Sequence, residues 1–299
     1  MAHEASVDGA GLQLDHPEEV TNGFIQKQHD RIGMLRSMVD SIGVINTGRA
    51  VYDRMRSRGA YGRNDIVQAT ASQARFPLLV GINPNDLANY TEIFREDVYA
   101  LPSEIADTVD GKYIVDLGAF TGLATAYLAS RYRKSQLLSV EPNPRNYELL
   151  AANAEPFGEQ IKPLFAAVSP VPGVVGASHP RGDAHDYMSI HFAVGDTGLE
   201  PVPLARVPEV VTPTDIVRQT GEDAIGILKV DIEGAEQALF QSGAVDELLG
   251  RTAVLMIETH DRYVAGCTDA VRTAIMRNGF ERHASESHTA TFLNPDFVQ

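Results

Sequence analysis

Residues 226–236 read Gly-Ile-Leu-Lys-Val-Asp-Ile-Glu-Gly-Ala-Glu, an apolar run that ends abruptly in acidic residues and a glycine. The apolar part predicts a buried strand, because strands covered on both faces read as near-continuous hydrophobic runs. Residues 113–122, Tyr-Ile-Val-Asp-Leu-Gly-Ala-Phe-Thr-Gly, repeat the pattern with one acid and two glycines. Open parallel sheets bind ligands at the carboxyl ends of their strands. The two stretches therefore predict a parallel sheet with a site at that edge.

The segment from residue 111 to residue 260 alternates strand and helix patterns, which is typical of a doubly wound sheet. We predict core strands at 112–117, 136–141, 161–168, 225–231 and 252–259, preceded by a short strand at 75–81. We predict helices at 86–96, 121–132, 144–155, 234–248 and 268–278, and a closing antiparallel pair at 279–283 and 289–293. Residues 169–213 predict a β excursion over the sheet. The predicted fold class is α/β, a Rossmann-like, doubly wound, mostly parallel sheet with an N-terminal helical extension.

The chain divides into three predicted parts. Residues 1–22 show no hydrophobic period and predict a mobile tail. Apolar residues then recur at helical spacing, so residues 23–75 predict a helical extension, which would cap the active site or join two subunits of a homodimer. Residues 76–299 form the remaining, catalytic domain.

Composition narrows the classes of function. The 299 residues include 40 acids against 25 Lys and Arg, a net charge of −15; this charge repels phosphate backbones and predicts no nucleic-acid partner. No apolar stretch approaches the roughly 18 residues of a membrane span, and the first residues lack the regions of a signal peptide. We therefore expect no membrane partner and a cytoplasmic location. The single cysteine, Cys267, rules out an internal disulfide and a cysteine-based zinc site. A small-molecule substrate fits these features best.

The turn at residues 116–122 predicts a nucleoside cofactor. Its glycines let the backbone approach a ligand closely, and the following helix points its N-terminus at that ligand. The nicotinamide fingerprint would need glycine at positions 120 and 123, where this chain has Phe120 and Leu123. The next strand ends in Glu141, where a ribose-binding carboxylate is expected. An acid beside the turn suits the sulfonium of S-adenosylmethionine better than a pyrophosphate, so that cofactor is predicted.

The predicted cofactor-binding residues come from the turn, the end of the next strand, a small residue beside the adenine, and the acid across the crevice. They are Asp116, Gly118, Ala119, Phe120, Thr121, Gly122, Glu141, Pro142, Asn143, Ala167 and Asp231. The alternative for Asp116 and Glu141 is that each only caps the helix after its strand.

Three residues at the ends of the fourth and fifth predicted strands are candidates for the chemistry. Side chains alternate along a strand, so Lys229, Asp231 and Glu233 share one face, and Glu258 shares a face with His260. We predict Asp231, Glu258 and His260 as catalytic residues. Either Asp231 or His260 would act as general base toward a hydroxyl. Alternatively, Asp231, Glu258 and His260 would together hold a divalent cation such as Mg²⁺ that activates the hydroxyl.

Several of these polar residues also have a purely structural interpretation. Lys229 is expected to neutralise Asp231 or Glu233, and Glu236 to be an acid in the first turn of a helix. His260 has the alternative of a satisfied histidine at a strand end. The His- and Asp-rich loop at residues 179–186 would contact substrate or metal, or simply be solvated.

Taken together, these motifs resemble the FkbM family of S-adenosylmethionine-dependent methyltransferases. Residues 115–123 resemble its cofactor turn, although Phe120 stands where the family often has asparagine. Residues 228–236 are similar to its signature and are the most specific part of the match. Residues 254–260 look like the strand that closes the family's site, and the resemblance covers about residues 76–295.

The resemblance implies a class I methyltransferase fold and an O-methyltransferase in natural product biosynthesis, acting on a hydroxyl of a small natural product or sugar. Methylation of a carboxylate, phosphonate or amine is the nearest alternative. A catalytically silent methyltransferase fold that serves as a partner subunit is another, and a hydride-transferring enzyme is a third.

Overall fold

The structure is a computed structural model that describes residues 66–82, 84–178, 191–194, 206–221, 224–283 and 289–298, and the single positions 39, 43 and 47. The predicted tail and most of the predicted helical extension lie outside these residues. Within the extension, Ile66–Ala69 forms strand β1, which pairs antiparallel with β2 (Leu78–Gly81). Residues 66–69 are therefore a strand rather than part of a helical segment.

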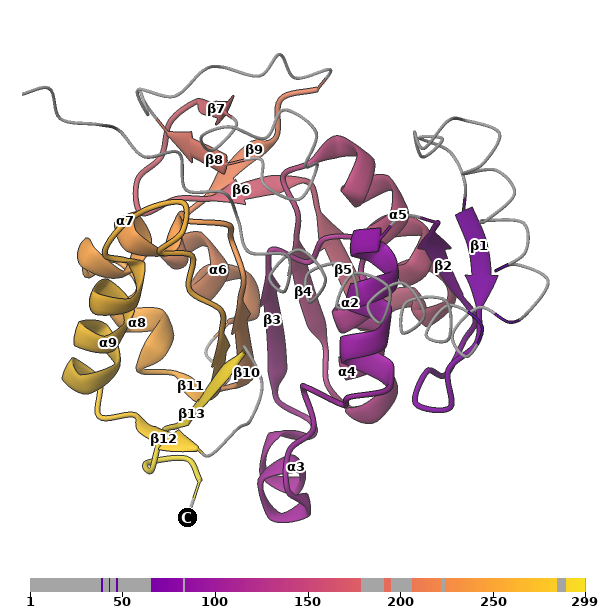
Figure 1. The fold of residues 1–299 in the computed structure, drawn as a ribbon. Helices are drawn as coiled ribbons and strands as arrows, with labels where there is room; N and C mark the ends of the chain where they lie inside the picture. The colour runs from indigo at the N-terminus through magenta and orange to yellow at the C-terminus, as the bar shows by residue number, and fades with distance from the viewer. Residues whose placement is uncertain are drawn as a thin grey trace, which may run out of the picture.

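The predicted fold class is confirmed by a seven-stranded sheet with the order β12-β13-β11-β10-β3-β4-β5. Five strands run parallel, namely β3 (Tyr113–Leu117), β4 (Leu137–Val140), β5 (Ile161–Leu164), β10 (Ile225–Val230) and β11 (Thr252–Ile257). The predicted closing pair, β12 (Glu281–His283) and β13 (Ala290–Leu293), is antiparallel. Strands β3 and β10 are neighbours, so the ends of the two motif strands meet in the middle of the sheet (Figure 1).

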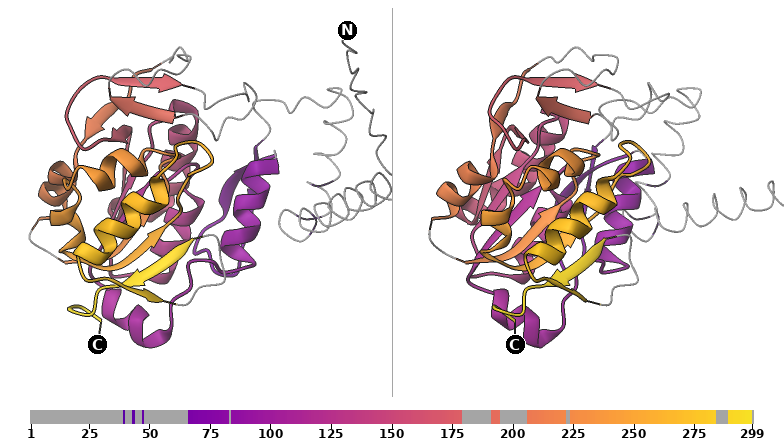
Figure 2. Two further views of the ribbon diagram at one scale, coloured as in Figure 1. Left: turned by 60° about the vertical axis from the view of Figure 1, so that its left-hand side comes forward. Right: turned by 90° about the vertical axis from the view of Figure 1, so that its left-hand side faces the viewer.

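Helices cover both faces of the sheet, because successive side chains of each buried strand point to opposite faces. Ile114 and Ile227 belong to one hydrophobic cluster, whereas Val115 and Leu228 belong to the other. The first cluster includes α2 (Pro84–Phe94), α3 (Ser103–Val109) and α4 (Leu123–Arg131). The second includes α6 (Pro213–Thr220), α7 (Glu236–Gln241), α8 (Asp246–Leu249) and α9 (Cys267–Arg277). Figure 2 shows the layers from two further sides.

Two predicted elements are each divided in the structure. The predicted strand 161–168 leaves the main sheet after β5, and its remainder, β6 (Ala166–Val168), pairs with β9 (Glu209–Val211) instead. The predicted helix 234–248 forms α7 and α8, because Gly243 between them has φ +71°, a conformation that no right-handed helix contains. The predicted helix 144–155 ends one residue early as α5 (Pro144–Ala154), followed by the 3₁₀ segment η1 (Glu155–Gln160).

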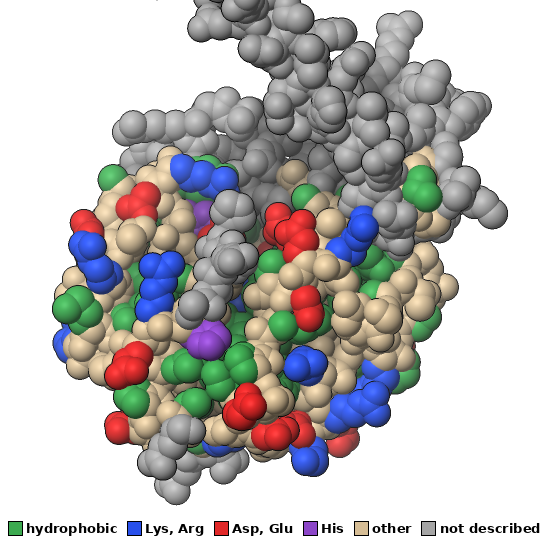
Figure 3. All heavy atoms as spheres, turned by 60° about the horizontal axis from the view of Figure 1, so that its bottom comes forward, with side chains coloured by type: hydrophobic (Ala, Val, Ile, Leu, Met, Phe, Trp, Pro, Cys, Tyr) green, Lys and Arg blue, Asp and Glu red, His purple; other side chains and the backbone are tan. Residues whose placement is uncertain are grey.

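The β excursion predicted for residues 169–213 is present in its described parts. Strand β7 (Val175–Ser178) pairs antiparallel with β8 (His191–Val194), and both lie beyond the ends of β3 and β4 in Figure 1. The loop at 179–186 lies outside the described residues. No helix in the described part of the chain is both long and apolar enough to cross a membrane. On the face shown in Figure 3, the coloured acidic and basic side chains are interspersed.

Candidate functional site

Two loops touch at the carboxyl edge of β3 and β10. The Asp231 amide donates a hydrogen bond of 2.9 Å to the Leu117 carbonyl, which continues the pairing of the two strands. Gly118 has φ +80°, and a Cβ atom on it would lie 1.7 Å from the Asp231 carbonyl oxygen. Only glycine fits at this position. The predicted close approach of the turn is therefore a contact between the two motif loops themselves.

Asp116 lies beneath this contact between the two loops and not at the surface where a cofactor was expected to bind. Its side chain is fully buried, with one oxygen 3.0 Å from Lys229 Nζ and the other accepting a 2.7 Å hydrogen bond from Thr125 Oγ1. Lys229 Nζ also donates to the Gly118 carbonyl at 3.1 Å, and Asp231 lies 3.8 Å away. The expected pairing of Lys229 with Asp231 is therefore present, but the nearest carboxylate to Lys229 is Asp116, which the sequence did not indicate. This buried ion pair supports the glycine turn from behind.

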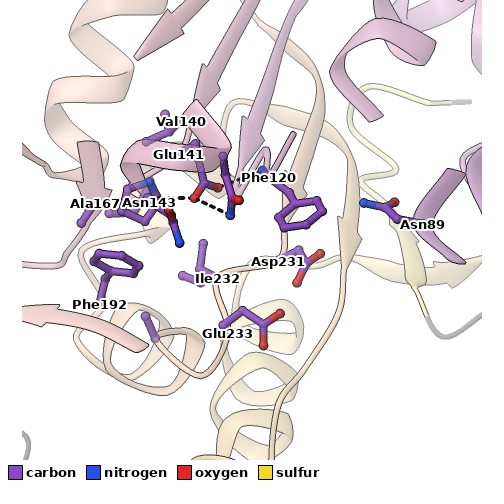
Figure 4. A pocket seen from close by; sticks show the side chains of 15 residues that line it. Asn89, Phe120, Val140, Glu141, Asn143, Ala167, Phe192, Asp231, Ile232 and Glu233 are labelled. Carbon is purple, nitrogen blue, oxygen red and sulfur yellow. Dashed lines mark hydrogen bonds between the residues drawn. The ribbon is translucent and has the colours of Figure 1, made fainter. Parts of the chain in front are cut away.

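A first pocket, with about 680 Å³ of empty space, opens above the turn. The predicted cofactor residues that line it are Gly118, Phe120, Glu141, Pro142, Asn143, Ala167 and Asp231. Four others, Asp116, Ala119, Thr121 and Gly122, do not line it. Figure 4 shows Ala167 and Phe192 toward one end of the pocket and Asp231 and Glu233 toward the other.

Glu141 is the central polar group of the first pocket. One carboxylate oxygen accepts a 2.9 Å hydrogen bond from the Phe120 amide, and the other accepts a 2.8 Å bond from the Asn143 amide. The residue that caps α5 is Asn143, whose side chain accepts from the Arg145 amide, so Glu141 is not the cap. Burial raises the pKa of the Glu141 carboxyl to about 8, although its backbone hydrogen bonds act in the opposite direction. A carboxyl group held in this way presents its remaining lone pairs to the pocket.

The far end of the first pocket is apolar and receives one residue that the sequence reasoning missed. Ala167 and Phe192 lie there, and Val140, Val168 and Ile232 add to the apolar lining of the pocket. Phe192 comes from β8, in the excursion, where no local pattern marks it as a ligand contact. The pocket suits an adenosine cofactor, because it combines an apolar slot for the base, a carboxyl group for ribose hydroxyls, and acids near Asp231 for a sulfonium.

Two residues of the site have strained backbones. Phe120 has φ +49° and Glu233 has φ +53°, both in the left-handed region that glycine and asparagine tolerate best. This conformation at Phe120 is one that asparagine adopts readily, which agrees with the asparagine often found at this position in the FkbM family. Strain of this kind clusters at ligand-binding sites, where the surrounding structure holds it in place.

A second pocket, with about 1290 Å³ of empty space, adjoins the first and shares Asn89, Asp231 and Glu233 with it. One of its walls is a face of α2, where Asn85, Asn89 and Glu92 follow one another at helical spacing. Its other described lining residues are Ala88, Ile93, Glu96, Val98, Tyr99, Glu258, His260, Arg262 and Thr289. A group transferred between ligands of the two pockets would pass at the shared acids.

The structure brings the three predicted catalytic residues together around His260. Its Nε2 atom lies 3.6 Å from Asp231 Oδ1 and 3.7 Å from Glu258 Oε1, and the fourth group, Glu233 Oε2, lies 3.6 Å away. The imidazole itself is only 2 % exposed. Asp231, Glu258 and His260 each offer an oxygen or nitrogen atom, and these atoms lie within 4.8 Å of one another.

Glu236 was expected only as an acid in the first turn of a helix, but in the structure it also holds a loop and His260. It does open α7, but it is fully buried, and its carboxylate accepts hydrogen bonds from the Ile232 amide at 3.0 Å and the Gly234 amide at 2.8 Å. Its Oε1 atom also lies 2.9 Å from His260 Nδ1. Burial lowers the pKa of His260, but this hydrogen bond and the surrounding carboxylates outweigh it and raise the pKa to about 9.

Tyr99 is another residue of the site that no sequence motif marked. It follows α2, is 7 % exposed and lines the second pocket. Burial raises the pKa of its hydroxyl, and the charges of Lys229, Asp231 and Glu258 act on it as well. A neutral hydroxyl therefore stands at the wall of the second pocket.

Comparison with curated proteins finds two relatives. The chain is 24% identical over 241 residues to the AMB antimetabolite synthetase AmbE of Pseudomonas aeruginosa, which covers 68% of this chain and 11% of that protein. It is 36% identical over 64 residues to the methyltransferase sdnD of Sordaria araneosa, which covers 21% of this chain and 23% of that protein. The chain thus matches a minor part of the length of both relatives.

Solved structures with a similar arrangement have low sequence identity to this chain. Magnesium protoporphyrin IX methyltransferase from Synechocystis, solved with bound S-adenosylmethionine, is 11% identical with a TM-score of 0.38, over 69% of this chain and 79% of that one. The fibrillarin pre-rRNA processing protein of Methanococcus jannaschii is 13% identical with a TM-score of 0.39, over 77% of this chain and 82% of that one.

The family comparison bears directly on the two motif strands. The model of the methyltransferase FkbM domain matches residues 116–282, which is more than half of the chain. This range begins at the acid of the glycine turn, includes the strands that form both pockets, and ends in β12. The chain therefore belongs to the methyltransferase FkbM family.

Proposed function

We propose that this protein methylates a hydroxyl group of a small natural product or sugar. The observation that carries the proposal is the meeting of two pockets at Asp231 and Glu233, one suited to an adenosine cofactor and the other larger and polar. Such an arrangement holds a methyl donor and an acceptor in line across a shared wall, which converts a bimolecular step into an effectively unimolecular one.

The residues of the first pocket would hold the cofactor. S-adenosylmethionine supplies a methyl group on a sulfonium, which an acceptor oxygen can displace. Glu141 would accept hydrogen bonds from the ribose hydroxyls, while Ala167 and Phe192 would enclose the adenine. Asp231 lies at the opposite end, where its negative charge favours the sulfonium.

The second pocket selects among acceptors by charge. Its described acids are Glu92, Glu96, Asp231, Glu233 and Glu258, against Arg262 and the imidazole of His260, whose pKa is raised to about 9. This excess of carboxyl groups repels anionic ligands, so it disfavours the carboxylate and phosphonate acceptors named above. An amine acceptor is compatible with the charge and is the second candidate.

A hydroxyl acceptor must lose its proton as the new bond to the methyl carbon forms and the carbon–sulfur bond breaks. Asp231 and His260 both lie at the junction of the pockets, and Asp231 would take that proton as general base. His260 would do so only in its deprotonated form, because its pKa is raised to about 9. The alternative is a divalent cation on Asp231, Glu258 and His260 that lowers the pKa of the hydroxyl. We favour the cation, because ligand atoms of these three residues lie within 4.8 Å of one another.

The names of the curated relatives support a role in natural product biosynthesis, since one is an antimetabolite synthetase. The acidic composition supports a small-molecule acceptor over nucleic acid. The homodimer and the cytoplasmic location stay predictions.

The proposal is tested in two steps. Calorimetric titration with S-adenosylhomocysteine should show one site per chain, and absence of binding would remove the methyltransferase assignment from this pocket. A screen of hydroxylated and amino metabolites with methyl-labelled cofactor should then yield a labelled ether, detected by mass spectrometry. Asp231→Asn should abolish the label while the protein keeps its fold. A labelled amine would move the assignment to the second candidate.

A further inference from the structure

We propose that Asp231, Glu258 and His260 form a binding site for one divalent cation of the Mg²⁺ and Mn²⁺ class, and that Glu236 is the positioning residue that aims His260 at it. The site lies in the wall of the second pocket, where all three ligands are found. Binding of the cation stands on the geometry of these residues alone. Its use in activating an acceptor rests on the proposed function.

The spacing of the three ligand atoms suits a cation of this size. Atoms that bind one divalent cation at about 2.0–2.6 Å lie about 3–5 Å from one another. The observed separations from His260 Nε2 are 3.6 Å to Asp231 Oδ1 and 3.7 Å to Glu258 Oε1, and all three atoms fall within 4.8 Å. These separations are too long for hydrogen bonds and match ligands around a common centre.

The protonation pattern of His260 points the same way. Glu236 also accepts hydrogen bonds from two backbone amides, so as a carboxylate it can only accept from His260 Nδ1. A cation would have to displace the Nε2 proton of the imidazolium, and in the neutral ring that results the proton is on Nδ1 and Nε2 presents its lone pair. The contacts of Nε2 with Asp231, Glu233 and Glu258 are all longer than 3.5 Å. A buried carboxylate that accepts from one nitrogen of a histidine is the usual support of a metal ligand at the other nitrogen.

The local charge also calls for a cation. Asp231, Glu233 and Glu258 surround the imidazole. Lys229 lies closer to Asp116, at 3.0 Å, than to Asp231, at 3.8 Å, and its charge is thus shared with a fully buried acid. Clustered carboxylates are costly unless a cation neutralises them. Oxygen-rich sets with one imidazole suit Mg²⁺ and Mn²⁺ better than they suit softer ions.

A cation at this point would face the second pocket and the acceptor in it. It would lower the pKa of a coordinated hydroxyl, whose proton then leaves to a neighbouring carboxylate or to solvent as the oxygen takes the methyl group. Neither Asp231 nor His260 would then need to be the initial base.

The test is direct titration of the chelator-treated and desalted full chain with Mn²⁺, followed by electron paramagnetic resonance of the free ion. We expect one Mn²⁺ per chain with submillimolar affinity and competition by Mg²⁺. His260→Ala and Glu258→Gln should each weaken binding at least tenfold. Glu258 is partly exposed, with 36 % of its side chain accessible, so its substitution should not disturb the fold.

Glu236→Gln tests the positioning role. It should weaken Mn²⁺ binding by about 10- to 100-fold, with a much smaller change in affinity for S-adenosylhomocysteine, which reports whether the 231–235 loop is intact. An equal loss of both affinities would mean that Glu236 only supports the loop. Glu96→Gln is the matched control, because Glu96 lines the same pocket outside the ligand set. Glu96→Gln should change Mn²⁺ affinity by less than about twofold. A loss as large as that of Glu258→Gln would mean that Mn²⁺ is attracted by the negative charge of the whole pocket and not by specific ligands.

The cofactor titration separates the two proposals. A wild type that binds S-adenosylhomocysteine but no Mn²⁺ at millimolar concentration overturns the cation site and leaves the methyltransferase. Mn²⁺ binding without cofactor binding supports the cation site and removes the cofactor assignment. Binding of neither overturns both.

Discussion

The two pockets that meet at Asp231 are built in different ways. The first takes much of its lining from segments at the ends of successive strands, and its one buried acid, Glu141, is satisfied by backbone amides. The second draws its polar groups from α2, the end of β10 and the end of β11, and its acids face one another. The first is thus defined by local backbone geometry, and the second by long-range packing.

Because of this difference, the two pockets should respond differently to substitutions. A pocket made by backbone turns fails when a turn cannot form, whatever the side chains do. A pocket made by converging carboxylates keeps its shape when one carboxylate is lost, but its charge and ligands change. The following predictions use that contrast.

The largest effect is expected from Gly118→Ala, which should break both pockets. Its Cβ would lie 1.7 Å from the Asp231 carbonyl oxygen, so one of the two loops must move. We expect at least a 100-fold loss of S-adenosylhomocysteine affinity by calorimetry, about 3 kcal/mol. Gly158→Ala is the matched control, because Gly158 also has a positive φ, +59°, but nothing within 4 Å. Because its ψ of −132° lies outside the left-handed helical region, the substitution should cost about 1–3 kcal/mol of stability and leave affinity unchanged. Equal effects of the two would refute the contact argument.

Glu141→Ala should affect the first pocket alone. Above pH 8, where the Glu141 carboxyl is ionised, loss of this charged acceptor for the ribose hydroxyls costs about 1.5–3 kcal/mol, which corresponds to roughly 10- to 150-fold weaker S-adenosylhomocysteine binding. Mn²⁺ affinity of the same variant should stay within a factor of two. An unchanged cofactor affinity would remove Glu141 from the site.

The pH dependence of stability should also trace to Glu141. Its folded-state pKa is raised from 4.5 to about 8 by burial, so between these values the folded chain binds more protons than the unfolded chain. The free energy of unfolding contributed by this group therefore falls as pH rises, by about 2 kcal/mol between pH 6 and pH 8. Urea unfolding of the ligand-free protein measures it. Glu141→Gln should have a flatter profile over that range, and a profile identical to wild type would assign the dependence to other groups.

The smallest effect is expected from Tyr99→Phe, which removes one neutral hydroxyl from the wall of the second pocket. The aromatic ring keeps its contact with Tyr127, at 6.3 Å between ring centroids, so stability should change little. We expect a three- to tenfold rise in acceptor KM, about 1 kcal/mol, with an unchanged dissociation constant for S-adenosylhomocysteine. If the affinity for S-adenosylhomocysteine changed instead, Tyr99 would act on the first pocket, and its assignment to the second would be wrong.

The fold was largely predictable because the strands that carry it are continuous apolar runs. The predicted strand at 225–231 is β10 at 225–230, and the adjacency of β3 and β10 followed from doubly wound topology. Helix α6 was missed, although Thr212 forms a capping box with Asp215, because the helix has only 8 residues. The break after β5 was missed because it depends on β6 pairing with β9, more than 40 residues away.

The site was predictable where neighbours in sequence are neighbours in space. The spacing of Glu258 and His260 placed both on one face of a strand, and the structure brings them together with Asp231. The roles of Asp116 and Glu236 were not predictable, because each depends on a partner on another segment, Lys229 for the first and His260 for the second. The same holds for Phe192 and Tyr99, which reach the pockets only through the tertiary fold.

The lone cysteine of the chain gives this protein a built-in reporter. Cys267 begins α9, is fully buried, and its Sγ lies 3.6 Å from Glu236 and 3.7 Å from the Gly234 carbonyl. Burial raises the pKa of this thiol to about 11, so the native protein should react slowly with alkylating reagents. The labelling rate of wild-type protein would then measure how often α7 and α9 separate around Glu236. Ligands that stabilise the packing of α7 against α9 would slow alkylation of Cys267. The alkylation rate therefore reports how often the site opens.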